Sequence, residues 1–235
     1  MSTTTDPRKT QVPEQATATI AWQTRARGWL LIVQVFVAGA VSLAIEMAAS
    51  RLLAPNFGSS LFVWASLIGL ILLYLTIGYY LGGRLADRYP YSQVLYIITL
   101  LAALLTSIVP LIAQPVLDWS LHLFANSPLV IFYGSLLSVI VLFALPMILL
   151  GCVSPYAIRL RINQLGSAGR TAGMLYAIST AGSIVGTFLP VLVLLPDIGT
   201  RATFLSAALI LALLSILGLL TNPLPGRDES RPYLR

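Results

Sequence analysis

Residues 46–88 read EMAASRLLAPNFGSSLFVWASLIGLILLYLTIGYYLGGRLADR and contain two apolar runs divided by a turn. Pro-Asn-Phe-Gly at 55–58 separates the runs, and Gly-Gly-Arg-Leu-Ala-Asp-Arg at 82–88 closes the second one. Pro and Gly mark breaks in regular structure, and about 17–25 apolar residues form a helix long enough to cross the hydrocarbon of a membrane. The stretch therefore predicts the end of one membrane helix and the whole of the next.

The composition of the whole chain supports the same class. Hydrophobic residues make up 57% of the chain and charged residues only 9%, with a mean hydropathy of +0.88, whereas a soluble domain has about a quarter of its residues charged. The net charge of +6 is spread over turns and tails, without the basic, aromatic-interleaved surface that binds phosphates. We expect an integral membrane protein that contacts the lipid bilayer and no nucleic acid.

Six apolar runs are long enough to span a membrane, and Pro, Gly or Arg bounds each of them. They cover 29–53, 59–81, 92–112, 129–152, 172–195 and 203–221. The predicted fold is all-α and polytopic, with a six-helix transmembrane domain at 25–221. We expect a disordered cytoplasmic tail at 1–24 and a cytoplasmic C-terminal tail at 222–235.

Basic residues predict the orientation, because short cytoplasmic loops retain Lys and Arg. With the N-terminus inside, 12 of the 14 Lys and Arg residues are cytoplasmic, and only Arg51 and Arg201 lie outside. This bias predicts both termini in the cytoplasm. The location that we expect is a bacterial-type plasma (inner) membrane.

Between the third and fourth runs, residues 114–128 place polar side chains every four positions. This pattern predicts a short amphipathic helix on the outer membrane surface. His122 within it is either a solvated cap residue or a pH-sensing or ligand residue.

Glu46 is the strongest candidate for a functional residue, since a carboxylate within a spanning helix is costly. Gly39, Ser42 and Glu46 share one helical face, so the carboxylate faces protein or water. One interpretation is a site for a proton or an ammonium group near an outer vestibule. The alternative is an ion pair with Arg51 or Arg201, and Arg201 is the better candidate because Arg51 lies about 140° around the helix.

Two glycine motifs are expected to bring helices close together. Gly78 to Gly82 and Gly182 to Gly186 are both Gly-x-x-x-Gly, which allows backbones to approach in a membrane. Packing within the bundle and dimerisation are both compatible with this motif.

Catalytic and metal chemistry are not expected. The chain has one Cys and one His, and no Ser-His pair or pair of close carboxylates. We expect no enzyme, no metal and no cofactor.

The turn at 82–91 resembles the signature loop of major facilitator superfamily (MFS) transporters. Gly83, Asp87 and Arg88 match its Gly-x-x-x-Asp-Arg, in which charges latch helix ends, and Gly82 and Arg84 lie beside them. The trailing Gly-Arg-Arg of the signature is replaced by Tyr-Pro-Tyr at 89–91. The alternative is an ordinary basic cytoplasmic turn, which explains the same residues.

Further motifs resemble the membrane half of fused MFS/spermidine synthase proteins, over nearly the whole six-helix region. They are Glu46-x4-Arg51-Leu-Leu-Ala-Pro-x-Phe-Gly58-Ser-Ser-x-x-Val-Trp64, Gly78-Tyr-x-Leu-Gly82-Gly83-Arg84-x-Ala-Asp87-Arg88, Ser154-Pro155-Tyr156-Ala-Ile-Arg159, Gly173-x-Leu-Tyr176 through Gly182 to Gly186-Thr, and Pro196-x-Ile-Gly199-Thr-Arg201. The resemblance implies an MFS-like half bundle.

In that family such a region commonly precedes a cytosolic aminopropyltransferase domain, whose Gly-x-Gly-x-x-Gly turn is not found in this chain. The resemblance implies a non-catalytic module that binds or transports a small cationic solute of the polyamine type. Its expected substrate-binding residues are Glu46, Arg51, Trp64 and Arg201. Transport by half the usual MFS helices is expected to need a homodimer, and a separately encoded aminopropyltransferase is an expected partner. The alternative is a scaffold that anchors a soluble synthase or a larger membrane complex.

Overall fold

The computed structural model describes residues 14–125, 127, 129–162 and 168–222, and all regular structure in them is helical. The helices are α1 (Glu14–Phe57), α2 (Leu61–Arg88), α3 (Ser92–Leu123), α4 (Val130–Gly151), α5 (Val153–Arg161), α6 (Ala168–Leu189), the π-helical turn η2 (Pro190–Leu194) and α7 (Leu195–Thr221). Of the tails expected at 1–24 and 222–235, residues 1–13 and 223–235 lie outside the described part, and α1 begins at Glu14.

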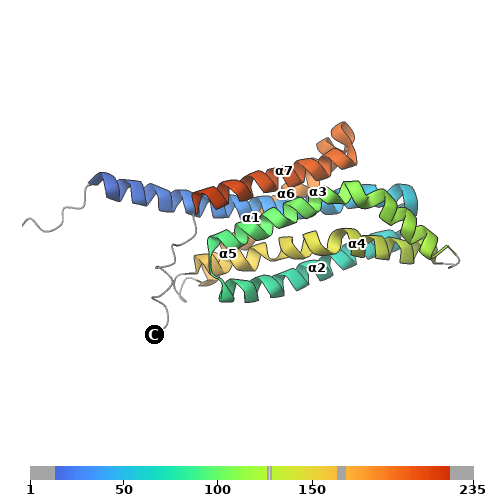
Figure 1. The fold of residues 1–235 in the computed structure, drawn as a ribbon, viewed down its shortest axis with the longest axis horizontal. Coiled ribbons are helices and arrows are strands. Elements are labelled where there is room, and N and C mark those ends of the chain that lie inside the picture. The colour runs from blue at the N-terminus through green and yellow to red at the C-terminus, as the bar shows by residue number, and fades with distance from the viewer. Residues whose placement is uncertain (1–13, 126, 128, 163–167, 223–235) are drawn as a thin grey trace, which may run out of the picture.

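Five helical segments are long and apolar enough to cross a membrane, which is compatible with the expected multi-pass protein. They are Gly28–Phe57, Leu61–Arg88, Ser92–Leu123, Val130–Arg161 and Ala168–Thr221. The last has 54 residues, or about 80 Å of helix against roughly 30 Å of hydrocarbon. Gly199 interrupts it with φ 78° and ψ 173°, a backbone conformation that glycine adopts without steric cost. Figure 1 shows α7 running back along the bundle, where it packs on α1 and α3.

The long helices form an up-and-down bundle (Figure 1). α1 packs on α6 and α7, α2 packs on α4, and α3 packs on both α4 and α7. No Cα atom of α2 lies within 8 Å of one in α6. We call the end with the α2–α3 turn and α5 the arginine end, for Arg84, Arg88, Arg159 and Arg161, and the opposite end, with Gly58 and Gly199, the Gly58 end. Arg51 and Arg201 lie toward the Gly58 end, as the charge pattern predicts.

Both glycine motifs lie at helix contacts inside the bundle. A Cβ atom added to Gly182 or Gly186 on α6 would collide with the backbone of Phe36 or Ala40 on α1. A Cβ on Gly78 would collide with Ile148, and one on Gly82 would lie 2.5 Å from the Cα atom of Cys152. Only glycine permits these approaches, so the motifs hold α6 against α1 and α2 against the α4–α5 junction.

The separate amphipathic helix predicted at 114–128 is not formed, and that prediction is wrong. α3 continues as one helix through Pro110 and Pro115 to Leu123. Leu117 and Ser120 are fully buried, because this part of α3 packs on α4, where Ser120 is hydrogen-bonded to Ser138 at 2.8 Å. Packing against α4 therefore keeps the segment in the bundle, and His122 is exposed near its end.

Candidate functional site

A cavity of about 280 Å³ opens between α1, α2 and η2 at the Gly58 end, and we call it the large cavity. Its lining includes Met47, Ser50, Arg51, Trp64, Val191 and Leu195. Two local features shape it. Gly58, with φ 73°, ends α1 by donating its N–H to the carbonyl of Ala54 at 2.9 Å. Pro190 lacks an N–H and begins the π-helical turn η2, and such turns often lie at functional sites.

A second cavity, of about 60 Å³, lies deeper between α1, α2, α5 and α6, and we call it the serine cavity. Ser42 of α1, Ser154 of α5, and Ser179 and Ser183 of α6 contribute hydroxyl groups to its wall. Tyr79 of α2 also lines it. Residues that carry hydroxyl groups therefore line this small cavity from four helices.

Glu46 lies on α1 between these two cavities. Ser42, one turn before it, lines the serine cavity, and Ser50, one turn after it, lines the large cavity. Residues four apart on a helix are neighbours on one face, with Cβ atoms about 5–6 Å apart. Glu46 itself lines neither cavity, but it lies one helical turn from a lining residue of each, and it is half-buried.

The structure separates the four residues predicted to bind substrate. Arg51 and Trp64 line the large cavity together, whereas Glu46 lies outside its lining, one helical turn from Ser50. Arg201 is exposed on α7 and also lies outside the lining. The ion pair considered for Glu46 is not formed, because no described arginine lies within salt-bridge distance of its carboxylate. The cause is geometric: α1 stays helical through Pro55 to Phe57, so Arg51 remains on another side of the helix.

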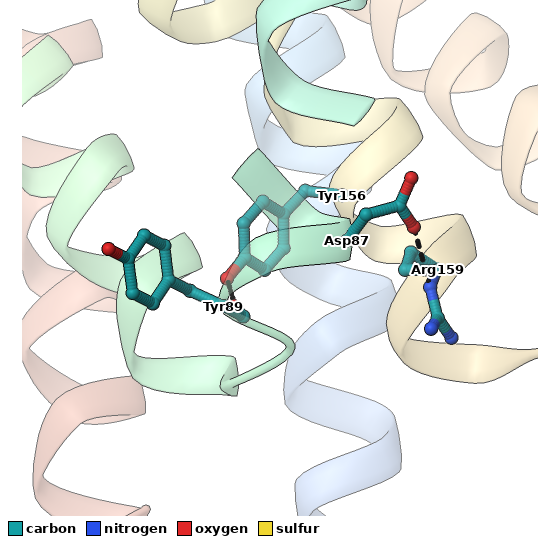
Figure 2. A network of polar contacts seen from close by, with 4 residues as sticks. All are labelled: Asp87, Tyr89, Tyr156 and Arg159. Atoms are coloured by element: carbon teal, nitrogen blue, oxygen red, sulfur yellow. Dashed lines mark hydrogen bonds and ion pairs between the residues drawn. The ribbon is translucent and has the colours of Figure 1, made fainter. Parts of the chain in front are cut away.

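Polar contacts join the α2–α3 turn to α5 at the arginine end, as Figure 2 shows. Nε of Arg159 donates a hydrogen bond to the Asp87 carboxylate at 2.8 Å. The hydroxyl of the fully buried Tyr156 lies against the carbonyl oxygens of Tyr89 and Tyr91, at 3.2 Å from the latter. One ion pair and the Tyr156 hydroxyl therefore connect the α2–α3 turn to α5.

The remaining motif residues have local roles or none that the contacts show. Arg84 lies over the ring of Tyr80, 4.8 Å from its centroid, and Arg88 lies over Tyr89 at 5.7 Å. A Cβ atom on Gly83 would meet open space, and Tyr176 is 54% exposed on α6. Pro155 is half-buried in the first turn of α5, where its missing N–H is tolerated.

Sequence reasoning missed the serine cavity. Ser42 was recognisable as part of the Glu46 face, and Ser179 and Ser183 flank the Gly182 motif. Their convergence with Ser154 depends on how four helices pack, and no spacing within one helix reveals that. In the described part of the chain no three His, Cys, Asp or Glu residues lie close enough to hold a metal ion.

Comparison with protein-family models, curated proteins and solved structures gave no match.

Proposed function

We propose that this chain is a non-catalytic membrane protein that binds a small cationic solute, with the Glu46 carboxylate as the group that holds the positive charge. The observation that carries the proposal is the position of Glu46. It is half-buried, it has no ion pair with a described arginine, and it lies one turn from a residue of the large cavity. A carboxylate in a membrane needs a compensating partner, and a bound cation supplies one.

The lining of the large cavity narrows the solute class. Met47, Trp64 and Leu67 offer apolar and aromatic surface, which suits a hydrocarbon stem and attracts a cation through the indole face. Arg51 on the same wall repels positive charge, so the ammonium groups of a bound solute would lie away from it, with one of them at Glu46. The cavity therefore favours an amine whose charged end reaches Glu46, and the motif resemblance to spermidine synthase-fused proteins points to the polyamine class.

We also infer six membrane crossings with both termini in the cytoplasm. The two legs of the 54-residue segment lie on either side of the Gly199 break, and each is long enough to cross alone. The arginine end would face the cytoplasm, where basic residues are retained. The large cavity would then open toward the outer side, in an inner membrane of the bacterial type.

The test is binding of putrescine and spermidine to the purified protein in nanodiscs, measured by isothermal titration. We expect saturable binding to the wild type and at least roughly tenfold weaker binding to Glu46→Gln, because removing one partner of a shielded charge pair costs several kcal/mol. Asp197→Asn, which removes an exposed carboxylate on α7, is the matched control. Equal binding by the wild type and Glu46→Gln overturns the proposal.

A second candidate is a scaffold that anchors a soluble synthase or a larger membrane complex. It is favoured by the exposed Arg84, Arg88 and Arg170, which present positive charge near the arginine end. Purification from native membranes in mild detergent tests it. If the chain is a scaffold, a stoichiometric partner co-purifies with the wild type and is lost when all three of these arginines are replaced by glutamine. If the chain is only a solute-binding protein, it purifies without a stoichiometric partner.

A further inference from the structure

The serine cavity has the composition of an ion site. Its hydroxyl groups come from three helices, α1, α5 and α6, with Tyr79 added by α2. None of its lining residues is Lys, Arg or His. At about 60 Å³ it has room for an ion and a few water molecules, whereas a longer solute fits only the large cavity.

Ser42 shows that the cavity wall contains an unused ligand. The residue is 6% exposed, and its hydroxyl forms no hydrogen bond with any described residue. Other buried helical serines behave differently: Ser138 donates to the carbonyl of Gly134 at 2.8 Å and Ser215 to that of Leu211 at 2.7 Å. Ser42 lines the cavity, and its oxygen is not among the fully buried atoms that lack a partner, so this oxygen is open to the cavity and available to a ligand there.

Ser183 indicates the sign of the charge that the cavity accepts. Its hydroxyl donates to the carbonyl oxygen of Gly39 at 3.2 Å. Because the hydroxyl proton is donated to the Gly39 carbonyl, only the lone pairs of the Ser183 oxygen can interact with a ligand. Lone pairs attract a cation and repel an anion.

Glu46 supplies the compensating charge. It follows Ser42 by one turn on the same face of α1, and helical side chains lean toward the N-terminus of their helix. Glu46 is not part of the cavity lining, but it lies one helical turn from Ser42, which places its carboxylate next to the cavity. A single carboxylate neutralises one positive charge, and hydroxyl oxygens add none, so the site suits a monovalent hard cation better than a divalent one.

We propose that the serine cavity binds one small monovalent metal cation, coordinated by the hydroxyl oxygens of Ser42, Ser154, Ser179 and Ser183 and neutralised by Glu46. The inference rests on the proposed function in one respect, because the same carboxylate serves the amine. One carboxylate neutralises one cation, so the metal ion in the serine cavity and the ammonium group in the large cavity compete for it.

Sodium is the probe. Binding of ²²Na⁺ to the wild type in nanodiscs is measured with N-methylglucamine chloride holding the ionic strength constant. We expect saturable binding, at least tenfold weaker in Ser42→Ala and Ser154→Ala and absent in Glu46→Gln. Ser42 and Ser154 lie on separate helices, so if one of the two substitutions disturbs helix packing, the other still tests the site. Ser107→Ala, which removes a hydroxyl that donates to the carbonyl of Leu104 on α3, outside both cavities, is expected to bind like the wild type.

Two outcomes overturn the cation site: no saturable ²²Na⁺ binding to the wild type, which means that the cavity holds only water, or wild-type binding by both serine variants. A parallel putrescine titration separates this failure from that of the proposed function. If Glu46 is needed for putrescine but no sodium binds, the proposed function stands and the cation site falls. If sodium binds through Glu46 but putrescine does not bind, the proposed function falls. Saturating sodium is expected to weaken putrescine binding in the wild type.

Discussion

The Asp87 carboxylate at the end of α2 lies 2.8 Å from Nε of Arg159 on α5, and this ion pair crosses from the α2–α3 turn to the helix that follows α4 (Figure 2). Beside it, Tyr156 contacts the backbone carbonyls of the same turn. An ion pair and a tyrosine hydroxyl therefore join the same two elements. We expect them to contribute differently to the stability of the protein, because the ion pair is exposed and Tyr156 is buried.

The ion pair is expected to contribute little to stability. The side chains of Arg159 and Asp87 are 48% and 72% exposed, and exposed ion pairs contribute about 0–1 kcal/mol. A double-mutant cycle of Asp87→Asn and Arg159→Gln, followed by thermal unfolding in detergent, is expected to give a coupling energy below about 1 kcal/mol. A coupling of several kcal/mol would show that the pair is shielded in the membrane-embedded protein.

Tyr156→Phe is expected to destabilise the protein more. Tyr156 is fully buried, and loss of its hydroxyl removes one donor from carbonyls that also accept from the N–H groups of Tyr91 and Val94, at a cost of about 0.5–1.5 kcal/mol. Tyr176→Phe on the exposed face of α6 is the matched control and should unfold like the wild type. The prediction fails if both variants unfold at the same temperature.

Gly186→Ala tests the contact between α6 and α1. The added methyl group collides with the backbone of Ala40, and backbone cannot move aside as a flexible side chain does, so overpacking should cost about 1–3 kcal/mol. Gly173→Ala on the same helix meets open space and should be neutral or slightly stabilising, because alanine favours the helix. Equal stability of the two variants would mean that α1 and α6 do not approach this closely.

Six crossings predict a specific labelling pattern. In a Cys152→Ala background, single cysteines replacing Ser59 and Asp197 should react with a membrane-impermeant maleimide from one side, and those replacing Tyr91 and Thr221 from the other. All four positions are exposed. Labelling of the Asp197 and Thr221 positions from the same side would mean that the 54-residue segment does not cross twice.

Much of the fold follows from local sequence patterns, and the site does so only in part. Apolar runs with Pro and Gly at their ends predict where helices begin and end, since membrane thickness sets their length. The segment at 114–128 was misjudged because polar residues at helical spacing suit a membrane surface, and also suit a helix whose other face packs on α4. Glu46 can be recognised from the sequence by itself, because a carboxylate within a membrane-spanning run is costly wherever its neighbours lie.

The serine cavity cannot be recognised from the sequence, because residues as far apart in the chain as Ser42 and Ser183 come together only when the helices pack.

The role of Glu46 is tested most directly by removing the charge from the protein in one experiment and from the solute in another. Putrescine and its uncharged analogue 1,4-butanediol are titrated against wild type, Glu46→Asp and Glu46→Gln in nanodiscs. Our account predicts that putrescine binds the wild type, binds Glu46→Asp more weakly and loses binding to Glu46→Gln, while butanediol binds none of them saturably. Putrescine binding that is undiminished in Glu46→Gln, or butanediol binding as tight as that of putrescine, would contradict it.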